Sequence, residues 1–202
     1  MPASTLFAIS DLHVGHPENR EIVESLHPDG DGDRLIVAGD VGEMFADVVW
    51  ALRLLAGRFA KVIWAPGNHE LWTPREDPVQ WCWERVALTG KRLDAVPAGL
   101  PTVLINHWPM VREPTRILRF PEFAQCCGTE LTADWHVRYR AAASVYGHLH
   151  IPRTTYYDGG ALRGGVGRLS AGVAPARHPA GAPAPDPRLS GSHRVADQGS
   201  RT

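Results

Sequence analysis

The feature that most constrains this chain is a series of five short apolar runs, each followed closely by polar residues. Every run is rich in apolar or β-branched side chains and is bounded by Gly, Asp, Pro or His. Runs of this length and composition predict buried β-strands. The predicted strands are residues 6–10, 35–38, 61–65, 102–106 and 144–146.

Two amphipathic stretches separate some of these runs. Apolar side chains recur at helical spacing from Phe45 to Phe59, and they repeat that spacing more loosely from Trp83 to Leu93. Strands that alternate with helices predict an α/β layered fold. Ligands of such sheets bind at the carboxyl ends of the strands, so chemically active residues should follow each strand.

The residues that follow the predicted strands are of the types that bind metal ions. Each of the five strands leads into Asp, Asn or His, and three of these positions include a Gly beside the polar residue. We therefore expect one cluster at one edge of the sheet. Its members are Asp11 and His13 after the first strand, Asp40 after the second, Asn68 and His69 after the third, His107 after the fourth, and His148 and His150 after the fifth.

The chemistry of these side chains favours a catalytic metal site. Imidazole nitrogen and carboxylate oxygen suit Mn, Fe or Zn, and the lack of thiolates argues against a structural zinc site. Asp11 and His13 lie two residues apart, so on an extended segment both can reach one ion. The two oxygens of Asp40 could bridge two cations roughly 3.5–4 Å apart. Gly39 and Gly67 would allow a close approach of the backbone.

Length and composition narrow the other possibilities. A chain of 202 residues with 44% hydrophobic content predicts one domain. The net charge of -1, without a basic run, gives no reason to expect nucleic acid. No apolar run approaches the ~20 residues of a membrane span, so no membrane partner is expected. Three cysteines without a CxxC motif fit a reducing compartment, so we expect a soluble cytoplasmic protein.

The last 44 residues differ from the rest in composition. Residues 159–202 contain no aromatic residue, no Lys and no Glu, and carry a net charge of +4 against -5 for residues 1–158. Such a segment offers little apolar surface to offset the entropy of ordering, so we expect it to be disordered. A frameshift at about Gly160 is a further hypothesis, because a shifted reading with GC-rich codons permits the strand-like sequence VRFEEVSVGYPREW.

The ordered series DLH, GD, GNHE, NH and GHLH resembles the signature of calcineurin-like metallophosphoesterases. The resemblance extends from Asp11 to His150. It implies an α/β/β/α sandwich with the metal site at the carboxyl ends of the strands. It also implies two divalent or trivalent ions, of Mn, Fe or Zn, with Asp40 between them. Asp11, His13 and His150 would hold one ion, and Asn68, His107 and His148 the other.

The resemblance also suggests how a phosphomonoester or phosphodiester would be hydrolysed. Two cations neutralise the phosphate oxygens and lower the pKa of a bound water, so that a metal-bound hydroxide attacks in line. The departing alkoxide needs a proton, which an imidazole can supply. His69 matches the acid of the family that contacts the leaving group, so His69 and Asp40 are the predicted catalytic residues. Substrate-binding residues are not predicted, although Trp72 and Trp108 lie beside the motifs.

Longer stretches narrow the resemblance to an actinobacterial subgroup that removes phosphopantetheine from acyl carrier proteins. They are LFAISDLHVGHPENR, AKVIWAPGNHELW, TADWH and SVYGHLHIPRTT. An acyl carrier protein is thus a candidate partner. Compared with the family, the chain is short between Trp72 and Thr102 and has an atypical tail after Gly159. A truncated, inactive scaffold of the same fold is therefore the competing hypothesis.

Overall fold

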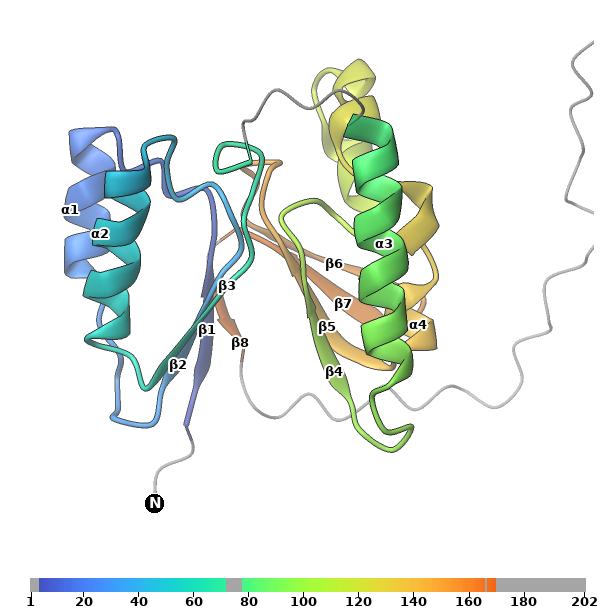
Figure 1. Ribbon diagram of the computed structural model, residues 1–202, viewed down its shortest axis with the longest axis horizontal. Coiled ribbons are helices and arrows are strands. Elements are labelled where there is room, and N and C mark those ends of the chain that lie inside the picture. Colours follow the sequence, from blue (N-terminus) through green and yellow to red (C-terminus); the bar gives the residue numbers. More distant parts are fainter. Residues whose placement is uncertain (1–3, 72–77, 166, 170–202) are drawn as a thin grey trace, which may run out of the picture.

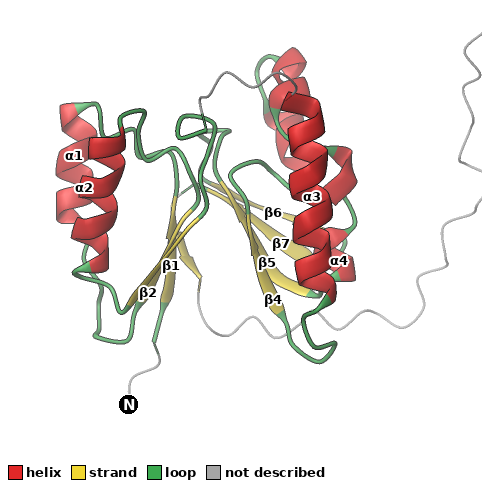
Figure 2. Ribbon diagram, in the orientation of Figure 1, coloured by secondary structure: helices red, strands yellow, loops and turns green. Residues whose placement is uncertain are grey.

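A computed structural model describes residues 4–71, 78–165 and 167–169 (Figure 1). Two β-sheets lie face to face, and helices cover the outer face of each (Figure 2). The four layers form the α/β/β/α sandwich that the family resemblance implies. The helices are α1 (Pro17–Ser25) and α2 (Phe45–Ala56) on one side, and α3 (Pro78–Asp94) and α4 (Trp135–Arg138) on the other.

The first sheet has the strand order β3-β2-β1-β8. Its strands are β1 (Leu6–Ile9), β2 (Arg34–Val37), β3 (Lys61–Trp64) and β8 (Gly167–Leu169). β1, β2 and β3 are parallel, whereas β8 runs antiparallel to β1. Because the three parallel strands point the same way, the loops after them leave the sheet at one edge.

The second sheet has the order β4-β5-β7-β6. Its strands are β4 (Thr102–Ile105), β5 (Ala141–Tyr146), β6 (Arg153–Tyr157) and β7 (Gly160–Gly164). β4 is parallel to β5, and β6 and β7 form an antiparallel hairpin. Short 3₁₀ helices, η1 (Glu113–Ile117), η2 (Pro121–Cys126) and η3 (Glu130–Thr132), connect β4 to α4.

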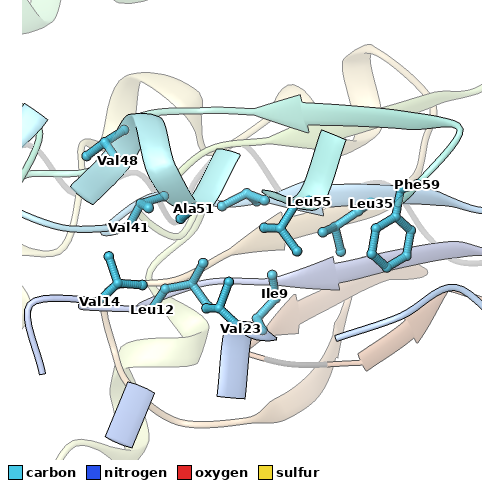
Figure 3. Close-up of a cluster of buried hydrophobic side chains, with 11 residues drawn as sticks. Ile9, Leu12, Val14, Val23, Leu35, Val41, Val48, Ala51, Leu55 and Phe59 are labelled. Atoms are coloured by element: carbon cyan, nitrogen blue, oxygen red, sulfur yellow. The ribbon is translucent and has the colours of Figure 1, made fainter. Parts of the chain in front are cut away.

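Three apolar clusters hold the layers together. The alternation of side chains along β1 sends Ile9 to the helix side of its sheet and Ala8 to the space between the sheets. On the helix side, Leu55 of α2 and Val23 of α1 pack against β1 and β2 (Figure 3). Between the sheets, Ile36 meets small residues of β5, which include Ala143. The third cluster lies between the second sheet and helices α3 and α4.

The five predicted strands and the two predicted helices are confirmed, with small shifts at their ends. Helix α1 was not predicted, because it is polar and buries only Val23. Disorder from residue 159 onward is wrong for β7 and β8, which pair with β5, β6 and β1. Each of these strands has a single Leu among Gly, Ala and Arg, which is too few large apolar side chains for a strand to be recognised from the sequence. Residues 170–202 lie outside the described residues.

Within the described residues, none of the helices is long and apolar enough to cross a membrane. The three cysteines, Cys82, Cys126 and Cys127, all belong to the described part of the chain and are free thiols.

Candidate metal centre

The loops after β1 to β5 lie at the carboxyl ends of these strands (Figure 1), and they carry the polar residues of the predicted site. Hydrogen bonds connect the loops of the two sheets at this place. The His148 backbone N–H donates to Asp11 Oδ1 over 2.8 Å, and His107 Nδ1 lies 2.9 Å from the Ala38 carbonyl oxygen. The sandwich therefore brings together residues that are far apart in the sequence.

One group of candidate ligands consists of Asp11, His13, Asp40 and His150. Each offers one nitrogen or oxygen, and these atoms all lie within 4.8 Å of one another. His150 Nε2 lies 3.5 Å from Asp11 Oδ1, and His13 Nε2 lies 4.0 Å from Asp40 Oδ2. The rings of His13 and His150 stack with their centroids 5.2 Å apart.

A second group consists of Asp40, His107 and His148, whose ligand atoms satisfy the same 4.8 Å limit. The side-chain oxygen of Asn68 joins them, 3.1 Å from His107 Nε2 and 3.0 Å from His148 Nδ1. His107 is fully buried, and its Nδ1 faces the Ala38 carbonyl, so Nε2 faces this group. The four donor atoms thus converge on one small space.

These residues fit divalent metal ions. All seven offer nitrogen or oxygen, which suits Mn, Fe or Zn. His13 Nε2 is buried and has no hydrogen-bond partner among the described residues, although a buried polar atom normally has one. A metal ion in the first group would satisfy this atom. Asp40, only 1% exposed, belongs to both groups and has two carboxylate oxygens.

The backbone at the centre is strained. Asp11, His13, Asp40, His148 and His150 all have positive φ, between 42° and 65°. This left-handed region is uncommon for residues other than Gly, and such outliers cluster at functional sites. The surrounding structure must therefore hold the backbone of these five residues in its left-handed conformation.

Two glycines allow the loops to approach each other as the sequence predicts. A Cβ on Gly67 would lie 2.2 Å from Asp40 Oδ1. A Cβ on Gly39, where φ is +85°, would lie 2.5 Å from His107 Nδ1. Neither position has room for a side chain, because the loops after β2, β3 and β4 touch there.

The pKa shifts of three of the candidate ligands favour metal binding. Burial raises the pKa of Asp40, but hydrogen bonds from His107 and the His69 backbone lower it more, so the net shift is downward. Burial lowers the pKa of His13 and His148. Burial also lowers the pKa of His107, but its contacts with Asp40 and the Ala38 carbonyl outweigh burial and raise it. The shifts of Asp40, His13 and His148 favour the unprotonated forms that bind metal, whereas the shift of His107 favours the protonated form, which would have to lose its proton to bind an ion.

His69 lies beside the two groups. Its backbone N–H donates to Asp40 Oδ1 over 3.0 Å, and its Nε2 lies 3.9 Å from Asp40 Oδ2. Its Nδ1 is 2.9 Å from Glu43 Oε1, and His13, Glu43 and His69 form a third group of candidate ligands. The interaction with Glu43 orients the ring and leaves Nε2 toward the centre.

Three other residues lie near the candidate site residues in the sequence: Trp72, Trp108 and Glu70. The Trp108 ring lies 5.2 Å from the His107 ring and 5.9 Å from the His148 ring. Trp72 lies outside the described residues. Glu70 is the last residue of the GNHE motif, which predicts a local hydrogen-bonding or loop residue and not a ligand. In the structure, its carboxylate binds backbone N–H groups of the Asp40 loop.

Comparisons with known proteins agree with this arrangement. Residues 4–152 match the family described as calcineurin-like phosphoesterase. The chain is 39% identical to the [acyl-carrier-protein] phosphodiesterase PptH of Mycobacterium tuberculosis, over 77% of this chain and 75% of that protein. The crystal structure of phosphopantetheinyl hydrolase (PptH) from M. tuberculosis superposes with a TM-score of 0.75 at 38% identity, covering 80% of this chain and 88% of that chain.

The alignment with the M. tuberculosis protein spans 242 residues, which is more than the 202 residues of this chain. The relative therefore has stretches without a counterpart in this chain. The matched family uses divalent metals to hydrolyse phosphoric esters, and its match covers more than half of this chain. The chain belongs to the calcineurin-like phosphoesterase family.

Proposed function

We propose that this chain hydrolyses a phosphomonoester or phosphodiester at a centre that holds two metal ions. The observation that carries this function is that the buried Asp40 belongs to both groups of candidate ligands. A carboxylate in this position can bridge two cations. When bound, the ions supply charge neutralisation for the phosphate ester and activation of a water molecule.

Each of the two groups of candidate ligands would bind one of the two ions. Asp40 is shared, and its ionised carboxylate is held between His107 and His13. Mn, Fe or Zn suits this set of nitrogen and oxygen donors. Asp11, His13 and His150 would hold one ion, and Asn68, His107 and His148 would hold the other.

His69 is suited to give a proton to the leaving group. Glu43 Oε1 lies 2.9 Å from its Nδ1, and a carboxylate at this distance accepts a hydrogen bond from Nδ1–H and orients the ring. Nε2 then faces the centre and can donate its proton to the departing alkoxide. The His69 side chain is 30% exposed, so solvent can return the proton after each turnover.

Metal-dependent hydrolysis tests the function directly. Purified protein loaded with Mn²⁺ should hydrolyse bis(4-nitrophenyl) phosphate or 4-nitrophenyl phosphate, and Asp40→Asn should remove this activity while the protein stays folded by circular dichroism. The metal content distinguishes the scaffold hypothesis. Fewer than one Mn, Fe or Zn per folded chain after loading, with no hydrolysis of either ester, would contradict an enzymatic function.

A second candidate is the release of phosphopantetheine from an acyl carrier protein. It is favoured by the 39% identity to a protein named [acyl-carrier-protein] phosphodiesterase, over most of both chains. The bond in question is a phosphodiester, so the same centre would serve. Mass spectrometry of a holo carrier protein, before and after incubation, would detect the loss of phosphopantetheine. If the protein hydrolysed the nitrophenyl esters without this loss, phosphoesterase activity would stand, and the acyl carrier protein would be contradicted as the substrate.

Composition also bears on the cellular compartment and on the partners of the chain. The free cysteines fit a reducing compartment, and we propose the cytoplasm. We expect neither a membrane nor nucleic acid as a partner.

A further inference from the structure

The carboxylate of Glu70 accepts hydrogen bonds from backbone N–H groups of two separate loops. From the loop after β2, Asp40 donates to Oε2 over 3.0 Å, Gly42 donates to Oε1 over 3.2 Å, and Val41 also donates to Oε1. From the loop after β3, Gly67 donates to Oε2 over 2.6 Å. Both oxygens are thus engaged with the backbone, so Glu70 is not placed as a metal ligand.

The same two loops are also joined in the opposite direction. The His69 backbone N–H donates to Asp40 Oδ1 over 3.0 Å. Each loop therefore supplies a carboxylate that accepts backbone N–H groups of the other loop. Asp40, Asn68 and His69 are the candidate ligands and catalytic residues that these loops carry. A displacement of either loop would change the distances among all three.

The backbone at this place needs such support. Gly39 and Asp40 have φ of +85° and +53°, and the amide N–H groups of residues 40–42 point into a common space. Successive backbone N–H groups arranged in this way form a concave site for an anion. The Glu70 carboxylate fills that site and offsets the cost of the left-handed conformation at Asp40.

We propose that Glu70 is a positioning residue that holds Asp40 in place for metal binding. This role rests on the proposed function, because Asp40 is the ligand shared by the two groups. Glu70 acts on the backbone of residues 40–42 and not on the metal or the substrate. Residues that orient metal ligands typically change metal affinity by 10- to 100-fold when they are replaced.

The variant Glu70→Gln tests this role with little change in size. The amide keeps one oxygen acceptor, but its NH₂ group faces backbone N–H donors, and the negative charge is lost. Isothermal titration of the metal-free protein with Mn²⁺ should show affinity lowered by about 10- to 100-fold. Glu24→Gln on α1 is the matched control, because Glu24 is exposed and far from the centre. It should bind Mn²⁺ as the unaltered chain does.

Hydrogen exchange of the metal-free protein separates this role from the proposed function. In Glu70→Gln the amides of residues 40–42 should exchange faster, whereas that of Ile36 in β2 should not change. This readout needs no bound metal and no substrate. A chain that is loaded with Mn²⁺ and still lacks phosphoesterase activity would contradict the proposed function and leave the exchange result standing.

Two outcomes would overturn the role of Glu70. One is unchanged exchange at residues 40–42 in the folded variant. The other is Mn²⁺ affinity within twofold of the unaltered chain. If Glu70→Gln does not fold, Glu70→Asp replaces it, since Asp keeps the charge but is one methylene too short to reach both loops. A coupled Mn²⁺ pair in the electron paramagnetic resonance spectrum, present in the unaltered chain and weakened in the variant, supports the positioning role over a general loss of stability.

Discussion

At the scale of single residues, the left-handed backbone of the candidate ligands has a measurable cost. His150 has φ of +52°, and its side chain is 58% exposed, so its removal breaks few contacts. For most residues with a Cβ, the left-handed region costs roughly 1–2 kcal/mol, and Gly avoids this cost. His150 is therefore a position where strain can be measured without disturbing the core.

We expect metal-free His150→Gly to be more stable than metal-free His150→Ala by about 1 kcal/mol. The two variants lose the same imidazole, so the difference reports the backbone strain. Urea denaturation measures both free energies of unfolding. The control pair is Glu21→Gly and Glu21→Ala on the exposed face of α1, where Gly should be the less stable by about 1 kcal/mol. The same order of stability at both positions would contradict strain at His150.

The proton donor can be tested at the same scale. We expect His69→Ala to lower kcat on a diester with an alkyl leaving group by roughly 10²- to 10⁴-fold. The effect on bis(4-nitrophenyl) phosphate should be much smaller, because nitrophenolate leaves without a proton. Steady-state kinetics on the two substrates gives the comparison. Equal losses on both substrates would assign His69 to metal positioning instead.

At the scale of elements, the loops after β2 and β3 meet so closely that a single methyl group should separate them. We expect Gly67→Ala to displace Asp40, since the new Cβ would lie 2.2 Å from Asp40 Oδ1. The variant should lose bound metal, measured by plasma mass spectrometry, and about 1–3 kcal/mol of stability. Gly15→Ala is the control, because a Cβ there meets nothing within 4 Å. Full metal content in Gly67→Ala would show that the loops can separate without harm.

At the scale of the whole molecule, outer strands of both sheets expose apolar side chains. Among the described strands, β3 and β4 each lie at the end of a sheet. Ile63 of β3 pairs with Ile36 of β2, and Val103 of β4 pairs with Ala143 of β5. Ile36 and Ala143 face the space between the sheets, so Ile63 and Val103 face the same way. Ile63 is 37% exposed and Val103 is 38% exposed. Outer strands with exposed apolar side chains favour association between chains.

We therefore expect this chain to associate with increasing concentration, and Ile63→Thr combined with Val103→Thr to reduce the association. Sedimentation velocity over a range of concentrations measures it. Ile22→Thr is the control, because Ile22 is 52% exposed but lies on α1 and not on a strand. A monomer at all concentrations would contradict the expectation, and so would an equal effect of the control.

Much of the fold and of the candidate site could be predicted from the sequence. The strands that carry the ligands are short and apolar, and their identity depends on local composition. Parallel strands bring the loops at their carboxyl ends to one edge of a sheet, so the positions of Asp11 and Asp40 after β1 and β2 already predicted that they would meet. His107 follows β4 of the second sheet, and it reaches them because the two sheets face each other.

Only the tertiary structure decided how the chain closes and supports this site. β7 and β8 have few large apolar side chains, and their pairing with β5 and β1 depends on contacts distant in sequence, so local composition predicted disorder there. The role of Glu70 depends on where the backbone of residues 40–42 comes to lie. The left-handed φ angles likewise result from the meeting of the loops. Side-chain types and strand order are local properties of the sequence, whereas these features arise from contacts between loops that only the folded chain brings together.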